Sequence, residues 1–390
     1  TFNHGIHTMN KDRMPSSFHW LNAAQSLGAL NDHVFKLFAI FFLIGLAGGE
    51  ASDRITGFVG LLFPLPFILF SSAAGVWADR YSKRDITVYA KYLEVAVMLF
   101  GAAGFALRSP AFIYAALFLM AAQSALFGPA KYGILPELVG KERLPRANGL
   151  LVMSTYIAII LGTALAPALA GLLGGNYPAA QFFCVLVAAL GTAASLPIRR
   201  TPPAGSRARV SPLFAREIWR TLWSIRSDRF LLLAVIGSAY FSVIGAFMQL
   251  NVIPYGIVHM GIRQEQSGYI ILLGAIGIAA GALVSSRISS RNIEFGIVPL
   301  GALALTVAAL GLYLVPPVFA WVCPTIFLAG FGAGLFIVPI DSFIQFQAPR
   351  ARLGEVLAAS SFLGWVGVLM AGGFIALNAS LGISPAAGFA

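Results

Sequence analysis

The sequence predicts an all-α membrane protein built from two bundles of membrane-spanning helices, and three observations predict it. The chain of 390 residues is 58% hydrophobic and only 11% charged, whereas a soluble domain carries about 25% charged residues. Apolar runs long enough to cross a bilayer follow one another toward the C-terminal end. One basic stretch, 199–228, interrupts the series after six runs. Such spans are helices, because lipid cannot satisfy the polar groups of an irregular backbone.

We expect six spans before the basic stretch and five after it. The first six cover 19–47, 55–78, 85–107, 110–137, 147–174 and 177–198, and the next five cover 229–258, 267–287, 293–316, 317–346 and 355–378. A twelfth span is expected to begin at Gly382 and to be incomplete in this chain. The predicted domains are therefore an N-terminal bundle with a short polar tail over 1–198, a basic linker over 199–228 and a C-terminal bundle over 229–390.

The net charge of +11 predicts orientation in a membrane, not a nucleic-acid partner. When the N-terminus is placed in the cytoplasm, most of the 26 Lys and Arg residues fall in cytoplasmic segments, as the positive-inside rule requires. Within the linker, Phe214–Ile225 is basic and amphipathic, which is typical of a helix lying on the membrane surface. The expected location is the bacterial inner membrane, crossed many times, with membrane lipid as a partner.

The two halves show signs of an internal repeat. "GVWADRYSKRD" follows the second span, and "GALVSSRISSRN" follows the eighth span. The first loop resembles the signature loop of the major facilitator superfamily, G-x-x-x-D-R-x-x-(K/R)-(K/R), although Ser82 replaces its usual glycine. The resemblance implies the major facilitator fold of two six-helix bundles. It also implies a conformational latch between the halves, formed by the matching residues Gly75, Asp79, Arg80, Lys83 and Arg84.

Other segments resemble the bacterial lysophospholipid transporter family. They are "LNDHVFK", "GPAKYGILPELV", "ANGL", "EFGIVPLGAL" and "VLAASSFLG". The resemblance implies a flippase that moves lysophospholipids, such as lysophosphatidylethanolamine, to the cytoplasmic leaflet for reacylation by alternating access. It also implies a partner, an acyltransferase–acyl-carrier-protein synthetase that is separate or fused, so that this chain would be the transporter domain.

Charged residues interrupt the first span. An ionisable residue in a span costs about 2.5–3.5 kcal/mol on insertion scales and usually faces a bundle interior or water. At 100° per residue, Gln25, Asp32 and Lys36 share one narrow face with Asn22, and His33 borders it. Asp32 and Lys36 are four residues apart and are expected to pair. They are candidates for substrate binding or gating, and the alternative is a structural pair.

Further polar residues lie in spans 4, 7 and 10, which in the major facilitator fold line a central cavity together with span 1. As point charges, Lys36 or Lys131 could bind a phosphate, and Asp32 or Asp341 an ammonium. Gln249 and Asn251 point about 200° apart, so at most one faces a shared site. Lys91 and Glu94, in span 3, are interpreted as structural. The remaining candidates for substrate binding or gating are therefore Lys131, Gln249, Asp341 and Gln345.

Two alternatives remain open, one for the role of Lys131 and one for the function of the whole chain. Lys131 could instead pair with Asp79 or Glu137 in a cytoplasmic gate. The chain could also be a proton-coupled major facilitator transporter of a drug or small metabolite, with Asp32 as the proton carrier. The sequence contains no phosphate-binding glycine loop, metal cluster or nucleophile elbow. We therefore expect a transporter that is not an enzyme, with no catalytic residue, cofactor or metal.

Overall fold

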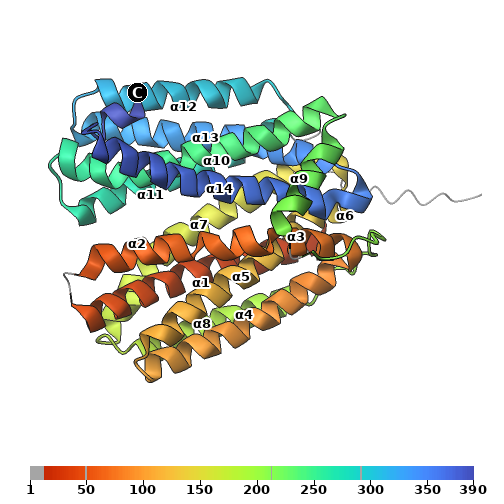
Figure 1. Ribbon diagram of the computed structural model, residues 1–390, viewed down its shortest axis with the longest axis horizontal. Coiled ribbons are helices and arrows are strands. Elements are labelled where there is room, and N and C mark those ends of the chain that lie inside the picture. Colours follow the sequence, from red (N-terminus) through yellow and green to blue (C-terminus); the bar gives the residue numbers. More distant parts are fainter. Residues whose placement is uncertain (1–12, 49–50, 212, 290–291) are drawn as a thin grey trace, which may run out of the picture.

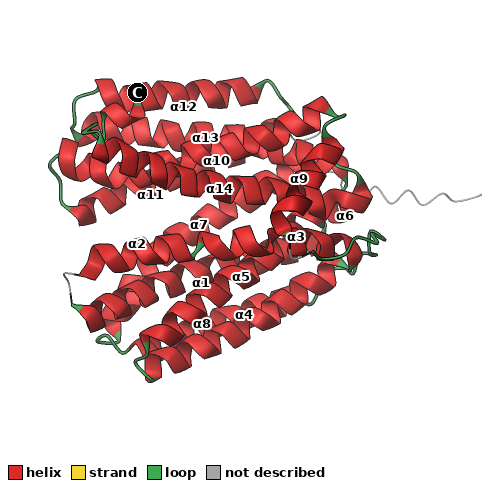
Figure 2. Cartoon of the chain, viewed as in Figure 1, coloured by secondary structure: helices red, strands yellow, loops and turns green. Residues whose placement is uncertain are grey.

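The computed structural model describes residues 13–48, 51–211, 213–289 and 292–390, and in these ranges it contains helices and loops without strands (Figures 1 and 2). Eleven segments are long and apolar enough to cross a membrane within the described ranges. The predicted all-α membrane fold is therefore confirmed.

The N-terminal half supplies six of these segments. Its helices are α1 (Ser16–Ala47), α2 (Ser52–Leu62), α3 (Pro64–Arg80), α4 (Lys83–Ala106), α5 (Pro110–Gly133), α6 (Leu135–Val139), α7 (Leu144–Leu172) and α8 (Tyr177–Ser195). The second span, expected as one helix, is divided into α2 and α3, which meet at Phe63. Pro64 opens α3 because a proline lacks the N–H that would continue the hydrogen-bond ladder of α2.

The C-terminal half follows the linker and its short helix. The linker helix is α9 (Phe214–Ile225), and the helices of the C-terminal half are α10 (Arg229–Pro254), α11 (Gln264–Ile288), α12 (Ile297–Leu314), α13 (Phe319–Gln347) and α14 (Leu353–Ser380). A π-helical turn, Tyr255–His259, extends α10. After Gly382, where a twelfth span was expected to begin, the chain forms a 3-10 turn at Ala387–Phe389. This turn packs into the core of the C-terminal half, where the Phe389 ring lies 5.5 Å from Tyr255.

The two halves meet along α3 with α14 and along α7 with α11. Glycine permits the close approach at both places. A Cβ on Gly75 would lie 2.6 Å from the Ala358 Cβ and 2.7 Å from the Gly354 carbonyl oxygen. A Cβ on Gly149 would lie 2.6 Å from the Ala282 carbonyl oxygen. Figure 1 shows that the halves converge at the end of the bundle where the linker and α9 lie, which we call the linker end, and diverge toward the opposite end.

Candidate functional site

A cavity of about 290 Å³ lies between the two halves. Its N-terminal wall comes from α5, and the rest comes from α10, α13 and α14. Two of the predicted site residues, Asp341 and Gln345, line it. Asp341 is partly accessible, whereas Gln345 is buried. The cavity therefore has a carboxylate on one wall and an amide beside it, at the position where the halves meet.

Four serines complete the polar lining, and the sequence did not single them out as site residues. Ser238 and Ser242 come from α10, and Ser360 and Ser361 come from α14. The Ser242 hydroxyl donates to the Ser238 carbonyl oxygen at 2.9 Å, a local bond that makes serine tolerable in a span. Serines are common in membrane helices for packing reasons alone. Only their meeting at one cavity distinguishes them.

An aromatic group forms the cavity wall toward the opposite end. The Trp365 ring, which lines the cavity, stacks on Phe67 across the interface between the halves at 4.2 Å and 26°. Phe63 lies 5.9 Å from the same indole. The Lys36 ammonium sits over the Phe63 ring at 5.4 Å from its centroid, within the range of a cation–π contact. Lys36 of α1 is thus connected through Phe63 to the wall of the cavity.

Asp32 and Lys36 do not form the predicted ion pair. The Asp32 Oδ2 accepts a hydrogen bond from the Ser124 hydroxyl at 2.6 Å, and the Lys36 ammonium turns to Phe63. A four-residue spacing allows pairing, but Ser124 of α5 and Phe63, between α2 and α3, give each side chain another partner. The second carboxylate oxygen of Asp32, Oδ1, is buried without a hydrogen-bond partner. This unpaired acceptor is available to a ligand cation or to a rearranged lysine.

Lys131 faces aromatic rings in this conformation. Its ammonium lies 4.6 Å from the Tyr132 ring centroid and 5.7 Å from that of Phe127. The sequence offered Asp79 and Glu137 as possible partners of Lys131 in a cytoplasmic gate, but both acids have other partners in this structure. Glu137 pairs with Lys83 at 2.6 Å, and Asp79 accepts from the backbone of α14.

Lys91 and Glu94 form a buried pair at 2.6 Å, with side chains 1% and 2% exposed. The Asn31 amide donates to the other carboxylate oxygen of Glu94 at 2.9 Å. A buried pair of this kind leaves an uncompensated charge if one partner is removed. These contacts agree with the structural interpretation of Lys91 and Glu94.

Gln25 and Gln249 lie apart from the cavity lining. The Gln25 amide, 2% exposed, donates to the Ser154 hydroxyl at 2.9 Å and accepts from Thr155 at 3.0 Å, which ties α1 to α7. Gln249 is exposed on α10. Asn251 is buried and donates to the Pro385 carbonyl oxygen at 2.8 Å. Of the two α10 amides, Asn251 is thus held by the C-terminal segment, and Gln249 remains the candidate.

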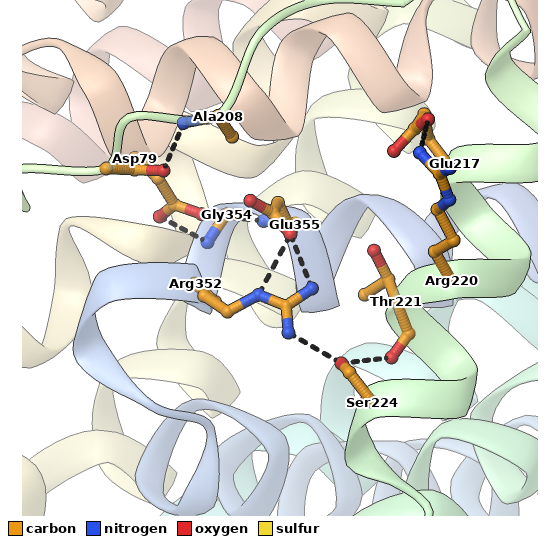
Figure 3. A network of polar contacts seen from close by, with 10 residues as sticks. Asp79, Ala208, Glu217, Arg220, Thr221, Ser224, Arg352, Gly354 and Glu355 are labelled. Atoms are coloured by element: carbon orange, nitrogen blue, oxygen red, sulfur yellow. Dashed lines mark hydrogen bonds and ion pairs between the residues drawn. The ribbon is translucent and has the colours of Figure 1, made fainter.

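The predicted latch residues lie at the linker end. The Asp79 carboxylate, fully buried, accepts from the N–H groups of Gly354 at 2.7 Å and Glu355 at 2.9 Å, as Figure 3 shows. These N–H groups belong to the first turn of α14, so an acid from one half caps a helix of the other half. Lys83 pairs with Glu137, as noted above, and Arg84 donates to the carbonyl oxygens of Leu196 and Ile198. Arg80 is exposed, over the Tyr81 ring.

Two further contacts join the halves at the linker end. The Gln345 amide donates to Asn148 of α7 at 2.9 Å and accepts from it at 3.1 Å. The Lys141 ammonium donates to the Phe346 carbonyl oxygen in the last turn of α13 at 2.6 Å, where a positive charge is favourable. Gln345 thus lines the cavity and also forms one of the contacts that close the linker end. The linker end is closed in this structure.

Comparisons with known proteins agree with this architecture. The family model described as Major Facilitator Superfamily matches residues 19–372. Among curated proteins, the lysophospholipid transporter LplT of Klebsiella pneumoniae is 28% identical over 372 residues, covering 93% of this chain and 89% of its own length. The protein of the same name from Salmonella gallinarum is 29% identical over 336 residues, covering 84% and 79%.

Solved structures show the same fold. The transporter FucP, in the outward conformation, superposes with a TM-score of 0.77 at 11% identity, covering 96% of this chain and 95% of its own. The human organic anion transporter MFSD10 gives a TM-score of 0.72 at 16% identity, with coverage of 97% and 96%. At this level of identity the likeness concerns the fold alone.

Proposed function

Because this chain belongs to the major facilitator superfamily, we propose that it moves lysophospholipids across the bacterial inner membrane to the cytoplasmic leaflet by alternating access. The chain is a transporter rather than an enzyme. The observation that carries the proposal is the likeness to lysophospholipid transporters over 93% of the chain. The cavity between the halves, polar on one wall and aromatic on another, suits a substrate with a charged head and an apolar tail.

The cavity chemistry supports a specific division of roles. The headgroup of a lysophospholipid pays heavily to cross hydrocarbon, whereas its single acyl chain does not. Asp341 would pair with the ammonium of lysophosphatidylethanolamine, and the serines would solvate the glycerol backbone. Lys36 and Lys131 would take the phosphate as point charges. Trp365 and Phe67 offer an apolar surface beside which the acyl chain leaves toward the lipid.

The proposed direction of transport rests on the orientation of the chain in the membrane. The linker end carries the basic loops, so we assign it to the cytoplasm, with the N-terminus on that side. The closed linker end then corresponds to the state that receives substrate from the outer leaflet. Rocking of the halves would open this end and deliver the lipid to the cytoplasmic leaflet. A separate or fused acyltransferase–acyl-carrier-protein synthetase would there restore the missing chain.

The test is movement of labelled lysophosphatidylethanolamine between leaflets of proteoliposomes that contain this chain, with and without an imposed proton gradient. We expect movement that needs the protein but not the gradient. If folded protein moves no lipid under either condition, the proposal fails, and a proton-coupled transporter of a small solute takes its place.

Two substitutions in α1 test the charges of the first span. We expect Asp32→Asn and Lys36→Ala each to lower lipid movement at least severalfold, because Lys36 contacts Phe63 beside the cavity wall and Asp32 keeps a carboxylate oxygen without a hydrogen-bond partner. The control is Gly45→Ala on the same helix, where an added Cβ meets nothing within 4 Å. Unfolding temperature in detergent checks that each variant is folded. Normal transport by both charge variants would exclude a role for this pair.

A further inference from the structure

A second, larger cavity of about 890 Å³ lies outside the central path, at the linker end. Its walls come from three parts of the chain: the end of α3 in the N-terminal half, the linker segment 205–211 with α9, and the start of α14 in the C-terminal half. Figure 3 shows α9 and the linker approaching α14 beside Asp79. The cavity therefore spans the contact between the halves and is roofed by the linker.

The charges of this cavity are unbalanced. Four arginines and two glutamates line it. Arg220 pairs with Glu217 at 2.7 Å, and Arg352 pairs with Glu355 at 2.8 Å. The other two arginines, Arg207 and Arg209, have no ion-pair partner among the described residues. A cavity with two unpaired guanidinium groups favours an anion, and guanidinium binds phosphate through two parallel hydrogen bonds.

The exposed aromatic side chains of α9 and the apolar walls of the cavity indicate that this phosphate belongs to a lipid headgroup. On the outer face of α9, Trp219 and Trp223 are 64% and 56% exposed and stack on each other. Arg226 lies over the Trp223 ring at 4.0 Å. Exposed tryptophan beside arginine is typical of a helix at the level of lipid headgroups. The cavity also has apolar walls at Val76, Val210 and Ile218, which suit the glycerol and first methylenes of a lipid.

The cavity depends on the closed state of the linker end. The Ser206 N–H donates to the Asp79 carbonyl oxygen at 3.3 Å, which holds the linker to α3. Arg352, at the start of α14, donates to the Ser224 hydroxyl of α9 at 2.7 Å, which holds α9 to the other half. When α3 and α14 separate, the two walls move apart. A ligand that needs both walls binds the closed state more tightly and stabilises it.

We propose that this cavity is a regulatory phosphate site, filled by the headgroup of an anionic phospholipid through Arg207 and Arg209, and that its occupancy holds the linker end closed. This site is separate from the transport cavity, and the proposal goes beyond the transport function. It links the rate of opening to the anionic lipid of the surrounding leaflet.

Binding is tested on the purified chain in detergent by the rise in unfolding temperature. The probes are phosphatidylglycerol, neutral phosphatidylcholine and inorganic phosphate. We expect phosphatidylglycerol to raise the unfolding temperature of the chain and phosphatidylcholine to leave it unchanged. The double variant Arg207→Gln/Arg209→Gln should raise the half-saturating concentration at least about tenfold, which corresponds to a loss of about 1.4 kcal/mol of binding free energy.

The controls separate this site from general surface charge. Arg216→Gln removes an exposed arginine of α9 that does not line the cavity, and we expect it to leave the half-saturating concentration unchanged. Arg207→Lys/Arg209→Lys should restore most of the affinity. Equal loss in the Arg216 variant, or none in the double variant, would overturn the proposal. Full stabilisation by inorganic phosphate without any by phosphatidylglycerol would overturn the assignment to lipid.

The effect on conformation needs its own measurement. A cysteine introduced by Ser360→Cys, in the wall of the transport cavity, reports opening when a membrane-impermeant maleimide is supplied from the linker end. Cys184 and Cys323 are first replaced by alanine. Phosphatidylglycerol should slow labelling severalfold in the parent and not in Arg207→Gln/Arg209→Gln. Labelling that is independent of the lipid in both would overturn the regulatory role.

Discussion

Replacement of Asp79 by alanine is expected to open the linker end and to abolish most transport. The substitution removes two hydrogen bonds from a buried carboxylate to the N–H groups of Gly354 and Glu355. It also removes a negative charge from the first turn of α14. At about 1.5 kcal/mol for each hydrogen bond, the closed state loses about 3 kcal/mol relative to the open state, a shift of roughly a hundredfold in population.

The measurement is labelling of the Ser360→Cys variant, with both native cysteines replaced, by an impermeant maleimide from the linker end. The parent should react slowly and Asp79→Ala quickly, and lipid movement should fall at least severalfold. Glu142→Ala is the matched control, because Glu142 is an exposed acid at the same end. Slow labelling of Asp79→Ala, in protein that unfolds at the parent temperature, would show that other contacts keep the halves together.

Those other contacts show what the sequence could and could not predict. The spans were predictable because membrane insertion imposes a length and a composition that a linear sequence displays. The signature loop could likewise be recognised in the sequence, because a motif is local, and it selected Asp79 and Lys83 as candidates for the latch. The closure by Gln345 with Asn148, and by Lys141 with Phe346, joins residues about 200 positions apart. No periodicity in one helix reports such a contact.

The sequence selects polar residues of the spans as candidates but does not predict the contacts that each of them makes. Charge in an apolar span is a strong signal, so Asp32, Lys36 and Asp341 stand out as candidates, and of these three Asp341 lines the cavity. Their partners do not stand out, because a helical wheel gives the direction of a side chain and not the neighbouring helix it meets. Asp32 therefore contacts Ser124 on α5, although Lys36 is its neighbour on the wheel. The serines around Asp341 gave no signal, since single hydroxyls are ordinary in membrane helices.

Asp341 is the residue whose replacement should separate one lipid headgroup from another. Among the charged candidates for substrate binding, it is the one that lines the central cavity. If its carboxylate pairs with a substrate ammonium, Asp341→Asn removes the charge while preserving the shape of the side chain. The lost contact is worth about 2 kcal/mol, so the half-saturating concentration of lysophosphatidylethanolamine should rise roughly thirtyfold.

Lysophosphatidylglycerol provides the internal comparison, because it has the same phosphate and acyl chain without an ammonium. We expect Asp341→Asn to move it as the parent does, and Asp341→Glu to recover part of the movement of lysophosphatidylethanolamine. Lys131→Gln should instead impair both lipids, since it removes a partner for the phosphate that they share. An equal loss of both lipids in Asp341→Asn would mean that this carboxylate supports the packing around the cavity or the rocking motion itself. The ammonium would then have to pair elsewhere, and Asp32, with its unpaired carboxylate oxygen, would be the acid to test next.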